Sequence, residues 1–171
     1  MRAYLNSQKV GALVSQMEAE QTLSRLGHTL PETPRPMANY IPTRRVGSLL
    51  FTAGMGPTLQ GEIKFKGKLG REITLEQGVE AARLAILNCL SAIKAELGDL
   101  DEIEHIVKLN GFVNSAPGFT KQPLVINGAS DLLVQVFGER GKHARTSIGV
   151  SELPNDIPVE IDLVVEVAGS E

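Results

Sequence analysis

Cysteine and aromatic residues are scarce in this chain of 171 residues, which has no tryptophan and one cysteine. The single cysteine, Cys89, excludes an intramolecular disulfide, and we interpret it as a small apolar residue buried in a helix. No cluster of cysteine and histidine has the spacing of a metal site, so we expect no metal. The three histidines are interpreted as structural or solvent-facing residues: His28, His105 and His143. Few aromatic rings also mean few platforms on which the bases of single-stranded RNA could stack, which weighs against a nucleic acid partner.

Long hydrophobic runs and a large net charge are missing as well. No apolar run approaches the ~20 residues of a membrane span, and the N-terminus lacks the basic and then apolar pattern of a signal peptide. A formal net charge of -3 gives no general attraction to nucleic acid or to acidic membranes. We therefore expect a cytoplasmic enzyme or binding protein without a membrane partner.

The first part of the chain differs in character from the rest. Apolar residues at helical spacing over 12–26 predict an amphipathic helix that packs on the remainder and ends at Gly27. Repeated prolines then predict an extended connector over 30–36. A chain of this length can bury one substantial core, so we expect an N-terminal extension, residues 1–36, followed by a single domain, residues 37–171.

Two later segments have the pattern of core-facing helices. In 74–97, Thr74 and Gln77 match a capping box, an apolar stripe follows, and Gly98 stands at the expected end. The second helix is expected over 122–137. Strands are expected at 46–54, 62–65 and 106–114. Short connections and helices on one face of a sheet predict an α+β layer architecture.

The last third of the chain predicts a β-hairpin. Alternating segments at 144–151 and 157–167 flank a Leu-Pro-Asn-Asp turn, and the second segment has an apolar row on one face. In this hairpin Glu160 lies opposite Gly149 and shares a polar face with Arg145, roughly 13 Å away along the strand. The guanidinium of a strand-borne arginine presents a planar fork of donors that fits a carboxylate. An exposed sheet face with ordinary surface charge is the alternative interpretation.

Three motifs add a more specific signal. They are the run Ala-Arg-Thr-Ser-Ile-Gly-Val-Ser-Glu-Leu-Pro-Asn-Asp-Ile-Pro-Val-Glu-Ile-Asp from Ala144, the segment Ser-Leu-Leu-Phe-Thr-Ala-Gly-Met-Gly-Pro at 48–57, and Val-Lys-Leu-Asn-Gly-Phe-Val-Asn-Ser at 107–115. Together they resemble the YjgF/RidA family, over about residues 39–167. The resemblance implies a chorismate-mutase-like fold, in which two main helices pack on one face of a mixed sheet. It also implies a homotrimer whose ligand clefts lie between subunits.

The same resemblance implies roles for individual residues. Arg145 matches the family arginine that holds the substrate carboxylate, and Glu160 matches the acidic residue that positions or activates water. The other matches near the cleft of the family are Asn127, Tyr40 at the rim, and Gly54. Ser147 stands where many members have a cysteine, and we count it among the binding residues. Ala53 and Met55 replace a serine and a glutamine, so the hydrogen bonds of those side chains are absent.

Arg145 and Glu160 are predicted to lie too far apart for one small substrate, so we hypothesise a site that combines Arg145 of one subunit with Glu160 of its neighbour. Family members hydrolyse reactive enamines and imines, such as 2-aminoacrylate, to a 2-oxo acid and ammonia without a metal or organic cofactor. The first hypothesis is therefore an imine deaminase acting on a small carboxylate-bearing substrate. A non-catalytic trimeric carboxylate-binding protein is the second, because of Ala53 and Met55, and a ribonuclease is the third.

Overall fold

The computed structural model describes residues 18–33 and 39–169 of the chain. Its helices are α2 (Glu18–Arg25), α3 (Leu75–Leu97) and α4 (Gln122–Phe137). Its strands are β1 (Thr43–Val46), β2 (Leu49–Thr52), β3 (Thr58–Leu59), β4 (Glu62–Ile63), β5 (Ile103–Asn114), β6 (Ala144–Val150) and β7 (Val159–Val167). Short 3₁₀ turns lie at Leu100–Glu102, Gly138–Gly141 and Pro154–Asp156.

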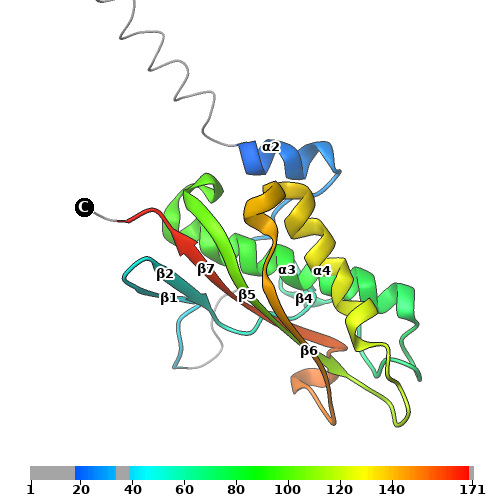
Figure 1. The fold of residues 1–171 in the computed structure, drawn as a ribbon. Helices are drawn as coiled ribbons and strands as arrows, with labels where there is room; N and C mark the ends of the chain where they lie inside the picture. The colour runs from blue at the N-terminus through cyan, green and yellow to red at the C-terminus, as the bar shows by residue number, and fades with distance from the viewer. Residues whose placement is uncertain (1–17, 34–38, 170–171) are drawn as a thin grey trace, which may run out of the picture.

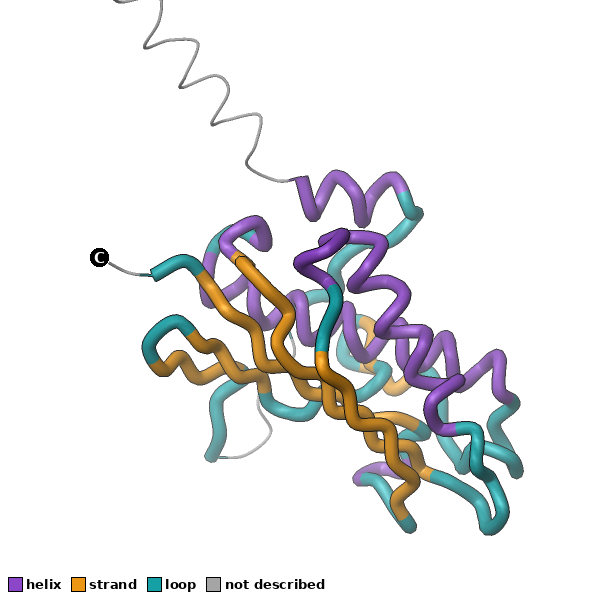
Figure 2. Tube along the Cα trace, in the orientation of Figure 1, coloured by secondary structure: helices purple, strands orange, loops and turns teal. Residues whose placement is uncertain are grey.

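The centre of the fold is a five-stranded mixed sheet in the order β1-β2-β7-β5-β6, and β3 pairs with β4 in a separate two-stranded sheet. The helices α3 and α4 lie side by side across one face of the large sheet (Figures 1 and 2). None of the described helices covers the opposite face, which we call the open face. The predicted α+β architecture, with two main helices on one side of a mixed sheet, is confirmed.

The helix α3 begins and ends where its capping residues predict. The Thr74 hydroxyl oxygen accepts a hydrogen bond from the Gln77 amide at 3.2 Å, and the Gln77 side-chain oxygen accepts one from the Thr74 amide at 3.0 Å. At the other end, Gly98 adopts a φ of 87° and donates its N–H to the Lys94 carbonyl at 2.7 Å. Cys89 of this helix is fully buried, and burial raises the pKa of its thiol. The predictions for α3 and Cys89 are confirmed, and α4 has its predicted bounds.

The strand predicted at 46–54 is wrong in its bounds, because a turn divides this segment. β1 and β2 form an antiparallel hairpin around Gly47, whose φ of +60° favours glycine. β4 stops at Ile63 and β5 starts at Ile103, so these strands are respectively shorter and longer than predicted. Strand boundaries here depend on where hydrogen-bonded partners lie, which the local sequence does not contain.

The strands β6 and β7 do not form the predicted hairpin, because β5 lies between them. β6 runs parallel to β5 on one side, and β7 runs antiparallel to β5 on the other. The chain reaches β6 from β5 through α4, a crossover of the kind that parallel neighbours require. The segment 151–158 then passes the end of β5, where the Asn114 amide donates to the Pro158 carbonyl at 2.9 Å.

This topology puts Arg145 and Glu160 on opposite faces of the sheet. Arg145 is paired with Leu109, which is paired in turn with Leu163, and paired residues project to the same side. Both leucines are buried under the helices, so Arg145 faces the helices as well. Glu160 is paired with Phe112. It lies three residues before Leu163 on β7, so its side chain projects to the opposite side of the sheet, which is the open face. The predicted shared face is wrong, and its physical reason is the strand inserted between β6 and β7.

The helix α2 lies against α4 and the turn before β5 (Figure 1). Ala19 and Leu23 are buried there, and the Asp101 carboxylate accepts hydrogen bonds from the Glu18 and Ala19 amides at 2.6 and 3.2 Å. The described part of the predicted helix is thus confirmed as a packing element. Residues 12–17 of that helix and residues 34–36 of the predicted connector lie outside the described residues. The division of the chain at residue 36 stays a prediction.

No helix among the described residues is long and apolar enough to cross a membrane. Nor do three or more His, Cys, Asp or Glu side chains gather in those residues so that they could hold a metal ion.

Candidate functional site

Arg145, near the start of the edge strand β6, is held by two side chains of α4. Its Nη1 donates hydrogen bonds to Asn127 Oδ1 at 2.8 Å and to Ser130 Oγ at 3.1 Å. Asn127 and Ser130 are three residues apart and therefore neighbours on one face of the helix. No carboxylate of the described residues forms an ion pair with Arg145. The guanidinium is thus oriented by neutral groups, and its positive charge is left for another partner.

Ser130 connects Arg145 to His143, and sequence reasoning missed this connection. Ser130 Oγ lies 3.0 Å from His143 Nε2, and His143 Nδ1 lies 2.7 Å from the Gly141 carbonyl oxygen. Burial lowers the pKa of His143, the hydrogen bond with Gly141 opposes this, and the nearby charge of Arg145 lowers the pKa further. The spacing of Asn127 and Ser130 in a predicted helix was the signal that could have pointed to Ser130.

Ser147 and Gly149 continue the row that Arg145 begins on the helix side of β6. The Ser147 hydroxyl is buried and has no hydrogen-bond partner among the residues that the structure describes. A Cβ at Gly149 would lie 2.8 Å from Gln122 Nε2 and 2.9 Å from Ser115 Oγ, so polar side chains sit directly over the strand there. Arg145 and Gly149, at the two ends of this row, therefore meet polar side chains of the helix side.

Glu160 lies on the open face against Gly54. A Cβ at Gly54 would lie 2.1 Å from Glu160 Oε1, so the glycine leaves the space that the carboxylate fills. Burial raises the pKa of Glu160, and the charge of Asp162 adds to this rise. Asp162 itself accepts a hydrogen bond from Asn110 Nδ2 at 2.9 Å. In the isolated chain, the space beside Gly54 is thus occupied by the Glu160 carboxylate.

The residues on either side of Gly54 turn away from the site. Met55 is buried, and its backbone exchanges hydrogen bonds with that of Ile161 at 2.8 and 3.0 Å. Ala53 packs against the hydrophobic core. Tyr40 is exposed and precedes β1, at the opposite edge of the sheet from β6. Within one chain the structure therefore brings Arg145 to Asn127 and Glu160 to Gly54, and it does not join Tyr40 to either pair.

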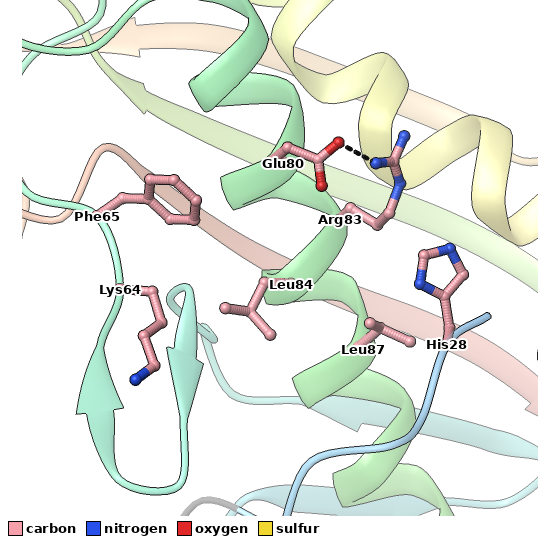
Figure 3. Close-up of a pocket in the computed structure, with 7 residues that line it drawn as sticks. All are labelled: His28, Lys64, Phe65, Glu80, Arg83, Leu84 and Leu87. Carbon is pink, nitrogen blue, oxygen red and sulfur yellow. Dashed lines mark hydrogen bonds and ion pairs between the residues drawn. The ribbon is translucent and has the colours of Figure 1, made fainter.

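A separate surface pocket of about 270 Å³ lies between α3, the segment after α2 and the residues that follow β4 (Figure 3). It is lined by His28, Lys64, Phe65, Glu80, Arg83, Leu84 and Leu87. Two of its cationic side chains are already paired within the chain, Arg83 with Glu80 and Lys64 with Glu62. None of the residues predicted for the site lines this pocket, so the candidate site is the one built on Arg145 and Glu160.

Comparison with known proteins decides the family. Residues 20–166 match the family described as "YjgF/chorismate mutase-like, putative endoribonuclease". The chain belongs to this family. The resemblance and the chorismate-mutase-like fold predicted from the sequence are confirmed.

Two similar proteins span nearly the whole chain. Protein TCP17 of Trypanosoma cruzi is 42% identical over 156 residues, which are 91% of this chain and 98% of TCP17. The crystal structure of Atu1372 from Agrobacterium tumefaciens, a protein of unknown function, is 41% identical with a TM-score of 0.85, over 94% of this chain and 98% of that chain. TdcF of E. coli, crystallised with bound serine, is 23% identical with a TM-score of 0.56, over 80% and 94% of the two chains. The likeness to TdcF shows the fold alone.

Proposed function

We propose that this YjgF-family protein is a hydrolytic deaminase, which converts reactive enamines and imines of the 2-aminoacrylate type to a 2-oxo acid and ammonia. The observation that carries the proposal is the Arg145 guanidinium, which Asn127 and Ser130 orient without neutralising it. Such a group is suited to bind a substrate carboxylate in two-point fashion. TdcF, which shares the fold, was crystallised with serine, an amino acid that carries the same carboxylate.

Water and proton transfers complete the reaction. The enamine takes up a proton at its terminal carbon and loses one from its nitrogen, which gives the imine. Water then adds to the imine carbon to form a carbinolamine. The nitrogen then takes a proton and leaves as ammonia, while the hydroxyl loses its proton and becomes the carbonyl of the 2-oxo acid. Glu160 accepts the proton of the attacking water and returns one to the leaving nitrogen. Its raised pKa makes both its acid and its base form accessible nearer to neutral pH.

A complete site requires a second subunit. Arg145 and Glu160 of one chain project from opposite faces of the sheet, so one small substrate cannot contact both. The open face, which holds Glu160, exposes the apolar side chains of Val46, Phe51 and Ile148, and exposed apolar patches are typical of association surfaces. We propose a homotrimer in which these faces turn inward, so that Glu160 of one subunit meets Arg145 of the next.

The deaminase proposal is tested by following ammonia and 2-oxo acid release from imines that a serine dehydratase or an amino acid oxidase generates in place. Wild type should accelerate release, while Arg145→Ala and Glu160→Ala should each lose the acceleration. Matched controls are Arg25→Ala, on the exposed side of α2, and Glu62→Ala, in the β3-β4 hairpin, and both should behave as wild type. No acceleration by wild type over a panel of side chains would contradict the proposal.

A non-catalytic carboxylate-binding protein is the second candidate. Met55, which stands where the family motif has a glutamine, is buried and cannot offer a polar group to a ligand. Ala53, in the place of a serine, has no hydroxyl. This candidate predicts that pyruvate binds in an Arg145-dependent manner while imine hydrolysis stays at the uncatalysed rate. The assay above, combined with a pyruvate titration, separates the two candidates.

A further inference from the structure

Three hydrogen bonds run in line from the backbone of the loop before β6 to the guanidinium of Arg145. They join the Gly141 carbonyl to His143, His143 to Ser130, and Ser130 to Arg145, with lengths of 2.7, 3.0 and 3.1 Å. Gly141 ends the 3₁₀ turn after α4, and His143 lies between that turn and β6. Arg145 belongs to β6 and Ser130 to α4. All four groups lie on the helix side of the sheet, at the edge strand.

With a neutral His143 ring, simple donor and acceptor rules fix every proton in this line. A carbonyl can only accept, so His143 Nδ1 carries a hydrogen that it donates to Gly141. In a neutral ring Nε2 is then an acceptor, and the Ser130 hydroxyl donates to it. A guanidinium can only donate, so the Ser130 oxygen accepts from Arg145 Nη1. Burial lowers the pKa of His143, which favours the neutral ring that this arrangement needs.

The line also determines which edge of the guanidinium is free. Nη1 has two hydrogens, of which one goes to Asn127 and one to Ser130. The edge formed by Nε and Nη2 has no hydrogen bond to any described side chain or carbonyl, and it is one of the two edges that can bind a carboxylate with two parallel hydrogen bonds.

We propose that Ser130 and His143 are positioning residues, which act through Arg145 to present the Nε and Nη2 edge to the carboxylate of the ligand. This inference rests on the proposed function, because it takes Arg145 as the carboxylate-binding group. Ser130 supplies the acceptor, and His143 fixes the orientation of that hydroxyl by accepting its hydrogen bond. Without His143 the hydroxyl can rotate, and without Ser130 one side of the guanidinium loses its support.

The test uses the full chain and measures the dissociation constants of pyruvate and of uncharged methyl pyruvate by calorimetry. The variants are Ser130→Ala, Ser130→Thr, His143→Ala, the double variant and Arg145→Ala. Loss of a hydrogen bond to a charged group should weaken pyruvate binding by Ser130→Ala roughly tenfold, while Ser130→Thr retains the hydroxyl and the affinity. Methyl pyruvate should bind equally to wild type and Ser130→Ala. Ser24→Ala and His28→Ala, at residues away from the site, are the matched controls.

Two further readouts separate positioning from a general structural role. Because His143 acts through Ser130, adding His143→Ala to Ser130→Ala should cause no additional loss, a non-additivity that independent roles would not produce. Nitrogen NMR of wild type at neutral pH should find the His143 hydrogen on Nδ1. This second readout needs no variant that could fail to fold.

The outcomes distinguish the inference from the proposed function. If wild type does not bind pyruvate, or if Arg145→Ala binds it as wild type does, the carboxylate-binding role of Arg145 in the proposed function fails and the inference fails with it. If Arg145→Ala loses binding while Ser130→Ala and His143→Ala bind as wild type, the inference alone is overturned. Additive losses in the double variant, equal losses for methyl pyruvate, or a hydrogen on Nε2 would also overturn it.

Discussion

Gly54→Ala should separate the activity of this protein from its stability. The new Cβ would lie 2.1 Å from Glu160 Oε1, where ordinary contact needs at least 3.4 Å. The carboxylate must therefore move by about 1.3 Å, and a displacement of this size at a reacting group can lower kcat/KM by about 100-fold. The obstacle is the end of a flexible side chain, and Gly54 does not have a positive φ. We therefore expect the free energy of unfolding to change by less than ~1 kcal/mol.

The assay is 2-oxo acid release from an imine generated in place, measured beside a urea unfolding curve. Gly169→Ala is the matched control, because no atom lies within 4 Å of the Cβ that it would add. A Gly54→Ala protein with the wild-type rate would refute the role given to the Glu160 carboxylate. A large loss of stability would refute the expectation that only the carboxylate end of the Glu160 side chain has to move.

Three other perturbations test separate parts of the structure. Cys89 should resist thiol reagents in the folded protein and react after denaturation, because it is buried and its pKa is raised, and mass spectrometry of the labelled chain checks this. Gly128→Ala should lower the free energy of unfolding by about 1–3 kcal/mol in a urea titration, because its Cβ would lie 2.2 Å from the Val79 carbonyl oxygen of the packed helix α3. Folding raises the pKa of Glu160 above its usual 4.5, so the charged form destabilises the native state as the pH rises through and above this value. Glu160→Gln should therefore melt at a higher temperature than wild type well above pH 4.5 and at the same temperature well below it, and an equal difference at both pH values would contradict this.

Signals that act over a few residues were predictable from the sequence. The capping box of Thr74 and Gln77 and the stop at Gly98 gave α3 its bounds, since the groups that satisfy a helix end are its close neighbours in the chain. The alternation of β7 likewise identified its buried face, from Val159 to Val167. Each of these features is decided locally.

Neighbour relations across the sheet were not predictable in the same way. The pattern of β6 and β7 is the same whether they pair directly or flank β5, and only the position of β5 assigns Arg145 and Glu160 to opposite faces. The family resemblance proposed Arg145, Asn127, Glu160 and Gly54 as site residues and did not include Ser130. The role proposed for Ser130 depends on the distance between α4 and β6, which no local pattern specifies.

Met55, beside Gly54, departs from the family motif. Met55 is buried, so the glutamine of the family motif has no polar counterpart there. Its backbone nevertheless pairs with Ile161, which keeps Gly54 beside Glu160. The position of the carboxylate therefore depends on the backbone of this segment and not on the replaced side chain.

The shared site is tested most directly by mixing the inactive variants Arg145→Ala and Glu160→Ala as unfolded chains and refolding them together. If Arg145 of one subunit works with Glu160 of its neighbour, each site draws one residue from each of two subunits. In random trimers about half of the subunits supply the intact arginine and about half the intact glutamate, so about a quarter of all sites have both. The refolded mixture should then recover about a quarter of the wild-type deaminase activity, while each variant refolded alone stays inactive. A mixture as inactive as its parents, although it forms trimers, would contradict a site built from two subunits.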